Sequence, residues 1–570
     1  MACHERQSCI VLIYGSDPGT AGRKVRTSAE AGANVREMLK DGKIWIANNE
    51  KGENIGIVPK MANRHGLVAG ATGTGKTVTL KVLAESFSDM GVPVFMADVK
   101  GDISGIADPG QPTEDMQKRI EKFGLADAGF EFKGYPVNIW DIFGQTGIQL
   151  RTTISEMGPV LLSRILGLND LQSDILNVIF KIADDNQLLL IDTKDLKAML
   201  AYVDDHSEDF QADYGKISSA SIGVITRAIV SLESAGGDVF FGEPDLEVTD
   251  WLTVNPEGKG MINILDSSSL INNGKLYSTF LLWLMSELFE TLPEVGDMDK
   301  PKMVFFFDEA HLLFDDAPKA LLDKIEQVVK LIRSKGVGVY FCTQNPRDIP
   351  DGVLAQLGNK VEHGLRAYTP ADQKSVRAAA DSFRENPEFD TYQTILELGT
   401  GEAVVSFLGE DGIPQMAEKV SILPPRCSFG QLSQDRRDSI VKSSLLYSKY
   451  AVNVDNMSAY EHLIASRAKD AEAKEAEKQA AEEAKAAAKA EKEAAKEAEK
   501  QAKAEAKEQA KADKARERAI KSVGNSVLGT IGRELGKSIG GKTGSSFGKT
   551  LGGNTGASLA RGLFGTLFKK

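Results

Sequence analysis

The central part of the chain alternates short apolar runs with longer segments of helical period. Between Arg64 and about Leu423 the apolar runs read HGLVAG, VPVFMADV, GMINILD, KMVFFFDEA, GVGVYFCTQ, KVEHGLRAY and EAVVSFLG. Several are apolar at consecutive positions, as expected for strands covered by helices on both faces. The pattern predicts an α/β domain around a mostly parallel sheet.

The flanks of this pattern suggest the domain boundaries. Residues 1–60 are weakly patterned and hold two short β-rich pieces, KIWIAN and NIGIVP. The apolar segments MGPVLLSRILGL and DILNVIFKIADD lie between two strands and predict a helical insertion at about 140–255. We place the α/β domain at 61–430 and a connecting segment at 431–465.

The C-terminal part has a different composition. Residues 466–522 are dominated by Ala, Glu and Lys, with no Leu, Ile or Val before Ile520. Alanine alone makes a weak coiled-coil seam, whereas Glu and Lys at i,i+4 spacing suit an isolated helix or a semi-rigid spacer. The sequence therefore predicts a long helical C-terminal extension.

The tail at 523–570 is basic and rich in glycine. Glycines fall on every fourth position from 532 to 556, and several apolar residues keep the same step. In a helix this places a glycine ridge beside an apolar ridge, which favours close approach of another helix. The alternative is a flexible tail, because glycine weakens helices. Its basic residues also suit contact with an anionic membrane surface.

Composition limits the cellular compartments and the binding partners that are expected for this chain. The net charge of −13 argues against a surface coated for nucleic acid, although a basic pore inside an acidic protein stays compatible with it. No apolar run has the length of a transmembrane helix, and the N-terminus lacks the features of a signal peptide. Four cysteines without CxxC spacing indicate a reducing, cytoplasmic location. The loose group Cys3, His4 and Cys9 is too incomplete to predict a structural metal.

The segment GATGTGKT fits the phosphate-loop pattern G-x-x-x-x-G-K-[ST] and lies between a strand-like run and a helical run. Backbone N–H groups of such a loop surround phosphates at the positive end of the helix. Lys76 is expected to reach the β- and γ-phosphates of ATP, and Thr77 to bind Mg²⁺. The predicted nucleotide-binding residues are Gly70, Ala71, Thr72, Gly73, Thr74, Gly75, Lys76 and Thr77.

The run KMVFFFDE ends in two carboxylates, in the manner of a Walker B strand. Asp308 is expected to hold Mg²⁺ through its water shell, and Glu309 to orient or deprotonate the attacking water. The next strand ends in Gln344, where RecA-like motors carry a polar residue that senses the γ-phosphate. The sequence thus predicts a RecA-like P-loop NTPase core.

The letters DEAH also name a class of helicases, but this chain lacks that class's SAT-like and QxxGRxGR motifs. Asp308 follows Lys76 by 308 − 76 = 232 residues, a much larger separation than those helicases have. We therefore exclude the DEAH-box interpretation and regard Ala310 and His311 as incidental.

From about Asn63 to Pro425 the chain resembles the HerA/FtsK group of ring-forming P-loop ATPases, and most closely its YjgR-like branch. The resemblance is carried by NRHGLVAGATGTGKTVTLKVLAESFSDMGVPVFMADVKGD, RTTISEMGPVLLSRILGLND and LIRSKGVGVYFCTQNPRDIPDGVLAQLGNKVEHGLRAYTPADQ. It implies a homo-hexameric ring that translocates double-stranded DNA. HerA proteins begin with a β-barrel, and the short N-terminal segment here predicts a truncated or absent barrel.

The resemblance also implies further catalytic residues. Arg64 matches an arginine near the nucleotide, and Asp98 matches an acidic position after the phosphate-loop helix. Arg333 matches an arginine finger supplied to a neighbouring subunit; the alternative is a cation favoured at a helix end. Arg366 is a rival for the finger.

Two functions follow. The first is a Mg²⁺-dependent ATPase that works as a ring and translocates DNA. The second is a nucleotide-switched scaffold whose tail docks to membrane or to other tails, without DNA translocation.

Overall fold

The computed structural model describes residues 39–40, 42–270, 274–314 and 319–523. The chain divides into two compact units, residues 1–470 and 471–570. The glycine-rich tail beyond Val523 and the group Cys3, His4 and Cys9 lie outside the described residues.

Thirteen strands of the described residues form one sheet. Their order in space is β1, β2, β13, β12, β11, β4, β10, β9, β5, β8, β6, β7, and β3 pairs with β2. The strands are β1 (Leu39–Lys40), β2 (Lys43–Asn49), β3 (Asn54–Ile57), β4 (Gly66–Ala69), β5 (Val94–Asp98), β6 (Val137–Asp141), β7 (Ile148–Gln149), β8 (Ile262–Asp266), β9 (Met303–Phe307), β10 (Val337–Thr343), β11 (Asn359–His363), β12 (Glu402–Ser406) and β13 (Glu418–Ile422).

The part of the sheet from β11 to β7 is parallel throughout. Every residue of β4, β5, β8, β9 and β10 is buried, because helices cover both faces. The predicted α/β class with a mostly parallel sheet is confirmed. β10 lies between β4, which leads into the phosphate loop, and β9, which leads into the two carboxylates. This is the RecA-like arrangement.

The aromatic side chains of β9 and β10 show which helices cover which face. Phe306 and Tyr340 pack against Phe87 of α2 (Lys76–Asp89), with ring centroids 6.2 Å away in each case. Because side chains alternate along a strand, Phe307 and Phe341 point to the opposite face. There Phe341 contacts Phe314 of α11 (His311–Phe314).

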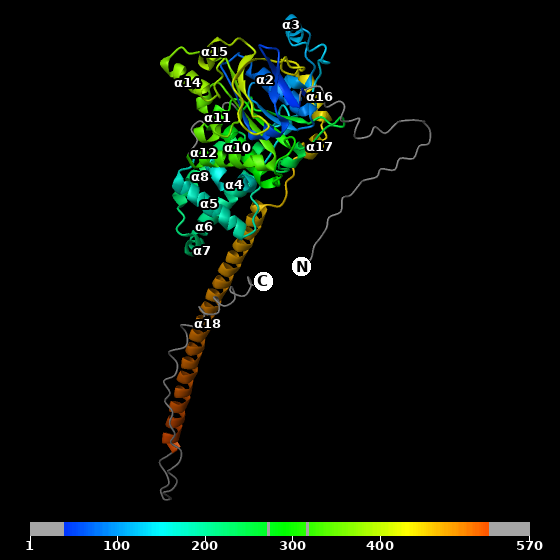
Figure 1. Cartoon of the computed structure of the whole chain (residues 1–570). Coiled ribbons are helices and arrows are strands. Elements are labelled where there is room, and N and C mark those ends of the chain that lie inside the picture. The colour runs from blue at the N-terminus through cyan, green and yellow to red at the C-terminus, as the bar shows by residue number, and fades with distance from the viewer. Residues whose placement is uncertain (1–38, 41, 271–273, 315–318, 524–570) are drawn as a thin grey trace, which may run out of the picture. The chain divides into compact units, whose positions relative to one another are not determined.

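Helices α4 to α9 follow one another between β7 and β8, and in Figure 1 α10, α11 and α12 lie between this group and the sheet. None of the helices in the described ranges combines the length and apolarity needed to cross a membrane. The bounds are α3 (Glu114–Lys122), α4 (Ile154–Leu166), α5 (Asp170–Asp185), α6 (Thr193–Asp205), α7 (Ser207–Tyr214), α8 (Ser219–Ser234), α9 (Gly237–Phe240), α10 (Gly274–Thr291), α12 (Lys319–Ile332), α13 (Asp351–Leu354), α14 (Pro370–Asp381), α15 (Thr391–Glu397), α16 (Gln434–Ser443), α17 (Tyr447–Tyr450) and α18 (Ala459–Val523).

The N-terminal strands belong to the same sheet as the phosphate loop. β13 pairs antiparallel with β12 on one side and with β2 on the other, and β2 pairs with β1 and β3. The short β-rich segment expected before the α/β domain is therefore an antiparallel extension of its sheet.

The segment after β13 crosses the outer side of α2. Lys81 donates from Nζ to the carbonyl of Ser428 at 2.8 Å, and the Glu85 carboxylate accepts the backbone N–H groups of Arg426 and Cys427. These contacts explain why α2 carries charged side chains that are 1% exposed. A buried charge is tolerated only when it is hydrogen-bonded.

Candidate functional site

The phosphate loop connects β4 to the first turn of α2. Gly70, Gly73 and Gly75 have φ values of 148°, 80° and 117°, a backbone conformation that side chains disfavour. The Nζ atom of Lys76 donates to the carbonyls of Gly70 at 2.6 Å and Ala71 at 3.1 Å. The ammonium group thus lies over the loop that is expected to surround the phosphates.

The neighbouring strands β11 and β12 anchor the phosphate loop through hydrogen bonds. The N–H of Ala71 donates to the carbonyl of Gly364 at 3.0 Å, directly after β11. His363 is buried, and its two ring nitrogens contact Thr79 Oγ1 at 2.8 Å and the carbonyl of Glu402 at 2.9 Å. Burial lowers the pKa of His363 to about 4, so its ring is neutral at pH 7.

Asp308 follows β9 at the same carboxyl edge of the sheet, and its side chain is buried. Its Oδ1 atom accepts the N–H of Glu309 at 3.0 Å, whereas Oδ2 has no hydrogen-bond partner among the described residues. Burial and the charge of Glu309 raise the pKa of Asp308. A buried carboxylate oxygen without a donor, on the edge where Thr77 lies in the first turn of α2, fits a hydrated Mg²⁺ ion.

Glu309 is fixed by its backbone and by three neighbours. Its φ is 49°, which is uncommon for a residue other than glycine. Oε1 lies 2.6 Å from Nζ of Lys100, and Oε2 accepts Nε2 of Gln344 at 3.2 Å. Nδ1 of His311 is 3.3 Å from Oε2. Burial alone raises the pKa of Glu309, but the hydrogen bond and charge of Lys100 lower it overall.

The structure therefore brings Glu309 and Gln344 together, as the sequence predicted for two residues of one site. Sequence reasoning missed Lys100 altogether and regarded His311 as incidental, although His311 contacts the Glu309 carboxylate. The available signal for Lys100 was its place in MADVKGD, directly after a strand that ends on the same edge of the sheet.

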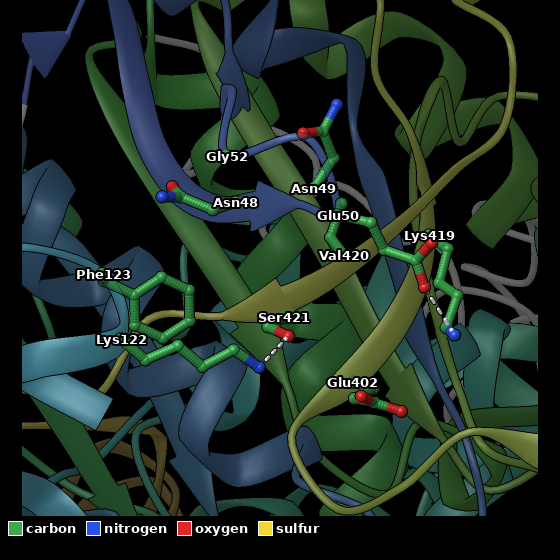
Figure 2. A pocket seen from close by; sticks show the side chains of 10 residues that line it. All are labelled: Asn48, Asn49, Glu50, Gly52, Lys122, Phe123, Glu402, Lys419, Val420 and Ser421. Atoms are coloured by element: carbon green, nitrogen blue, oxygen red, sulfur yellow. Dashed lines mark hydrogen bonds and ion pairs between the residues drawn. The ribbon is translucent and has the colours of Figure 1, made fainter. Parts of the chain in front are cut away.

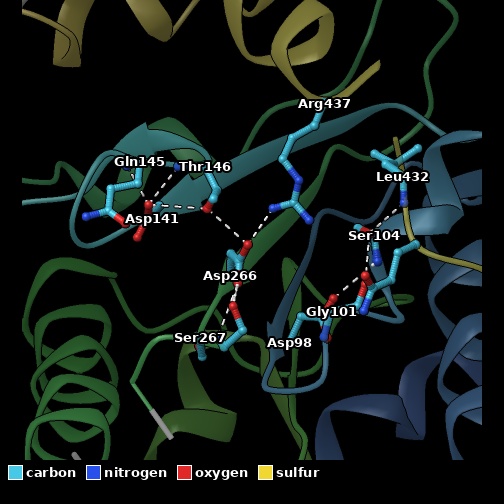
Figure 3. Close-up of polar contacts among 12 residues, drawn as sticks. Asp98, Gly101, Ser104, Asp141, Gln145, Thr146, Asp266, Ser267, Leu432 and Arg437 are labelled. Atoms are coloured by element: carbon cyan, nitrogen blue, oxygen red, sulfur yellow. Dashed lines mark hydrogen bonds and ion pairs between the residues drawn. The ribbon is translucent and has the colours of Figure 1, made fainter. Parts of the chain in front are cut away.

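Asp98 ends β5 and is 2% exposed (Figure 3). Its carboxylate accepts the backbone N–H groups of Gly101, Ile103 and Ser104, at 2.7, 3.0 and 3.2 Å. Burial and the charge of Asp102 raise its pKa to about 7. The observed contacts of Asp98 fix the turn that carries Lys100.

Arg64 and Arg333 lie on the opposite edge of the sheet from the phosphate loop. Arg64 lies two residues before the start of β4 and Arg333 lies four residues before the start of β10, while the loop and Gln344 follow these strands. β10 contains 7 residues, so its two ends are about 20 Å apart at ~3.3 Å per residue. Both arginines are at least one-third exposed. Neither reaches the phosphate loop of its own chain.

Arg366 follows β11 on the loop's edge and is held by its own chain. Its guanidinium donates to the carbonyls of Leu396 at 2.9 Å and Leu398 at 3.3 Å.

A separate hollow of about 320 Å³ lies on the antiparallel extension (Figure 2). Its charged groups are mostly paired: Lys419 binds Glu50 at 2.7 Å, and Lys122 donates to Ser421 Oγ at 3.0 Å. None of the predicted site residues lines it.

A glycine loop at a helix N-terminus, with a Walker B pair and a polar residue at adjoining strand ends, defines a P-loop ATPase. The chain belongs to the Helicase HerA-like C-terminal family, whose model matches residues 43–567.

The chain is similar to several named proteins. It is 22% identical over 399 residues to "DNA double-strand break repair helicase HerA" of Sulfurisphaera tokodaii, covering 68% of this chain and 71% of that protein. It is 30% identical over 146 residues to "Probable helicase MJECL08" of Methanocaldococcus jannaschii, which covers 25% of this chain and only 26% of that protein. The match to the solved structure of the plasmid coupling protein TrwB in complex with a non-hydrolysable ATP analogue covers 71% of this chain and 94% of that one, at 16% identity and a TM-score of 0.48.

Proposed function

We propose that the chain is a Mg²⁺-dependent ATPase that works as a homo-hexameric ring in the cytoplasm and translocates double-stranded DNA. The observation that carries the proposal is the distribution of polar groups over the two edges of the sheet. One edge holds the phosphate loop with Asp308, Glu309 and Gln344, and the other presents Arg64 and Arg333 to solvent.

Each residue on the first edge has a role in hydrolysis. Backbone N–H groups of the loop and the ammonium of Lys76 bind the ATP phosphates. Thr77 and Asp308 would hold Mg²⁺, which neutralises charge on the phosphates when it is bound. Glu309 orients the attacking water and accepts its proton, while the bond between the γ-phosphorus and the bridging oxygen breaks. Gln344, which binds Glu309, lies where it can respond to the γ-phosphate.

The second edge supports a ring. A cation about 20 Å from its own phosphate loop, by the length of β10, can act on ATP only in another chain. An interface that joins one edge to the opposite edge of the next subunit is heterologous, and such an interface forms a ring when the rotation between subunits closes. Arg333 is the better finger, because the guanidinium of its rival Arg366 is already bound to three carbonyls of its own chain.

DNA as the substrate is supported by the family and by the relatives named as helicases. The net charge of −13 does not oppose it, since only the inner surface of a ring has to attract phosphates.

The test is an ATPase assay with and without duplex DNA, on the wild type and on Glu309→Gln. We expect DNA to stimulate turnover. We expect the variant to bind ATP with near-normal affinity and to lose turnover by about 10²-fold or more, because the amide cannot accept a proton. Unchanged turnover in the variant would contradict the assignment of Glu309.

The same assay, with anionic vesicles in place of DNA, tests the alternative scaffold function. Stimulation by anionic vesicles but not by DNA, abolished by deleting residues 523–570, would favour tail docking to a membrane over DNA translocation. Self-association of the tail predicts that the deletion alters the size of the assembly without vesicles.

A further inference from the structure

The carboxylate of Glu309 is contacted on both oxygens by groups from three different segments. Lys100 comes from the loop after β5, Gln344 from the end of β10, and His311 from the start of α11. The Lys100 contact is the shortest at 2.6 Å, and it joins a carboxylate that is 7% exposed to an ammonium that is 43% exposed. The Glu309 carboxylate is therefore held chiefly by Lys100, in the loop that follows β5.

The backbone around Lys100 is itself held in place. Three hydrogen bonds from backbone N–H groups to the Asp98 carboxylate fix the turn that follows Lys100. In the same turn, Ser104 Oγ donates to the carbonyl of Gly101 at 3.0 Å. The carbonyl of Lys100 accepts Nε2 of Gln431 at 2.9 Å. Figure 3 shows that Ser104 Oγ accepts the N–H of Leu432, at 3.2 Å. A lysine on a fixed turn can define the position of its partner.

We propose that Lys100 is a positioning residue for ATP hydrolysis: it sets the orientation in which Glu309 binds and activates water. The inference rests on the proposed role of Glu309.

The geometry explains how Lys100 acts without blocking Glu309. A carboxylate has about four acceptor directions, and the three neighbours occupy at most three of them. One direction stays free for water. Without Lys100 the side chain of Glu309 regains rotamers, and misplacement of a reacting group by about 1 Å can cost about 10²-fold in rate.

The experiment measures kcat and KM for ATP in the full-length Lys100→Met and Lys100→Arg variants. Met keeps the length of the side chain and removes its charge, while Arg keeps the charge. We expect Met to lower kcat by about 10- to 100-fold with KM changed less than about threefold. Arg should recover most of the loss. Lys118→Met is the matched control, because Lys118 forms an exposed ion pair with Glu114 at 2.7 Å, and it should leave both constants unchanged.

A second comparison separates positioning of Glu309 from direct phosphate binding by Lys100. ATP affinity and residual turnover are measured for Glu309→Gln and for Lys100→Met combined with Glu309→Gln. If Lys100 acts through Glu309, the two proteins have the same residual turnover and the same ATP affinity.

The outcomes are distinct. A wild-type kcat in Lys100→Met, or a further loss of ATP affinity in the double variant, overturns the positioning role. Unchanged turnover in Glu309→Gln overturns the proposed function itself, whatever Lys100→Met does.

Discussion

The ion pair between Arg437 and Asp266 gives a prediction about what holds the segment after β13 to the ATPase sheet. Arg437 lies on α16, Asp266 ends β8, and each side chain is 9% exposed (Figure 3). The guanidinium lies 2.5 Å from Oδ2, which also accepts Thr146 Oγ1 at 3.0 Å, and Ser268 donates twice to Oδ1. Burial raises the pKa of Asp266, but the bonds from Ser268 and the charge of Arg437 lower it overall.

Arg437→Met should therefore leave a buried, ionised carboxylate without its cation. Breaking a buried pair from one side costs about 3–5 kcal/mol, and the remaining bonds from Ser268 and Thr146 put the expected loss near the lower end, about 3 kcal/mol. At ~2.1 cal/mol/K per residue, the unit that ends at Asp470 has an unfolding entropy of about 1.0 kcal/mol/K, so Tm should fall by about 3 °C.

The neighbouring Arg436 provides the matched control. It forms an ion pair with Asp108 at 2.9 Å, in which the side chains are 48% and 34% exposed. Such pairs contribute about 0–1 kcal/mol, so Arg436→Met should lower Tm by at most about 1 °C. Both variants are compared with the wild type by thermal unfolding at pH 7, and Asp266→Asn is added to Arg437→Met to recover part of the loss. Equal shifts for the two arginines, or no recovery in the double variant, would refute the account of the buried pair.

Two further predictions concern the residues under the phosphate loop. Burial raises the pKa of Glu362 from 4.5 to about 8, and its Oε1 has no hydrogen-bond partner among the described residues. The unfolded chain therefore releases this proton at lower pH than the folded protein, and Glu362 lowers stability as pH rises from 4.5 towards 8. In urea unfolding, the free energy of unfolding of Glu362→Gln relative to that of the wild type should rise by about 1–3 kcal/mol from pH 5.5 to pH 7.5. A difference between the two proteins that stays constant over this range would show that Glu362 does not titrate there. A Cβ atom at Gly70 would lie 2.5 Å from Cβ of His363, so Gly70→Ala should weaken ATP binding by about tenfold or more in a fluorescent-nucleotide titration, while Gly430→Ala, which has open space, should not.

The sheet and the two nucleotide motifs could be predicted because their signals are local. Apolar runs of strand length and the spacing of Gly70, Lys76 and Thr77 depend only on neighbouring residues. The placing of Gln344 with Asp308 and Glu309 was expected from the likeness to RecA-like motors, and it agrees with the rule that the carboxyl ends of parallel strands meet on one edge.

Contacts between distant segments could not be predicted in this way. The N-terminal strands join the ATPase sheet through β13, and no periodicity in KIWIAN specifies a partner more than 350 residues away. The hydrogen bonds of Asp98 to its own loop, and the contact of Lys100 with Glu309, depend on turn conformation rather than composition. Arg64 shows a related limit, because the resemblance assigns it to a nucleotide without saying which chain's nucleotide it is.

The central claim is that ATP is hydrolysed between two chains, and mixing two inactive variants tests it most directly. Lys76→Ala removes the phosphate-binding ammonium, and Arg333→Ala removes the proposed finger, so each protein alone should be inactive. In a mixed ring, an Arg333→Ala subunit has an intact loop and can receive Arg333 from a Lys76→Ala neighbour.

At equal amounts and random mixing across a head-to-tail interface, about one quarter of the sites are complete, and about one quarter of wild-type turnover is predicted. The same mixture with Arg366→Ala in place of Arg333→Ala tests the rival finger. A mixture no more active than its components, or full activity of Arg333→Ala on its own, would contradict hydrolysis between chains.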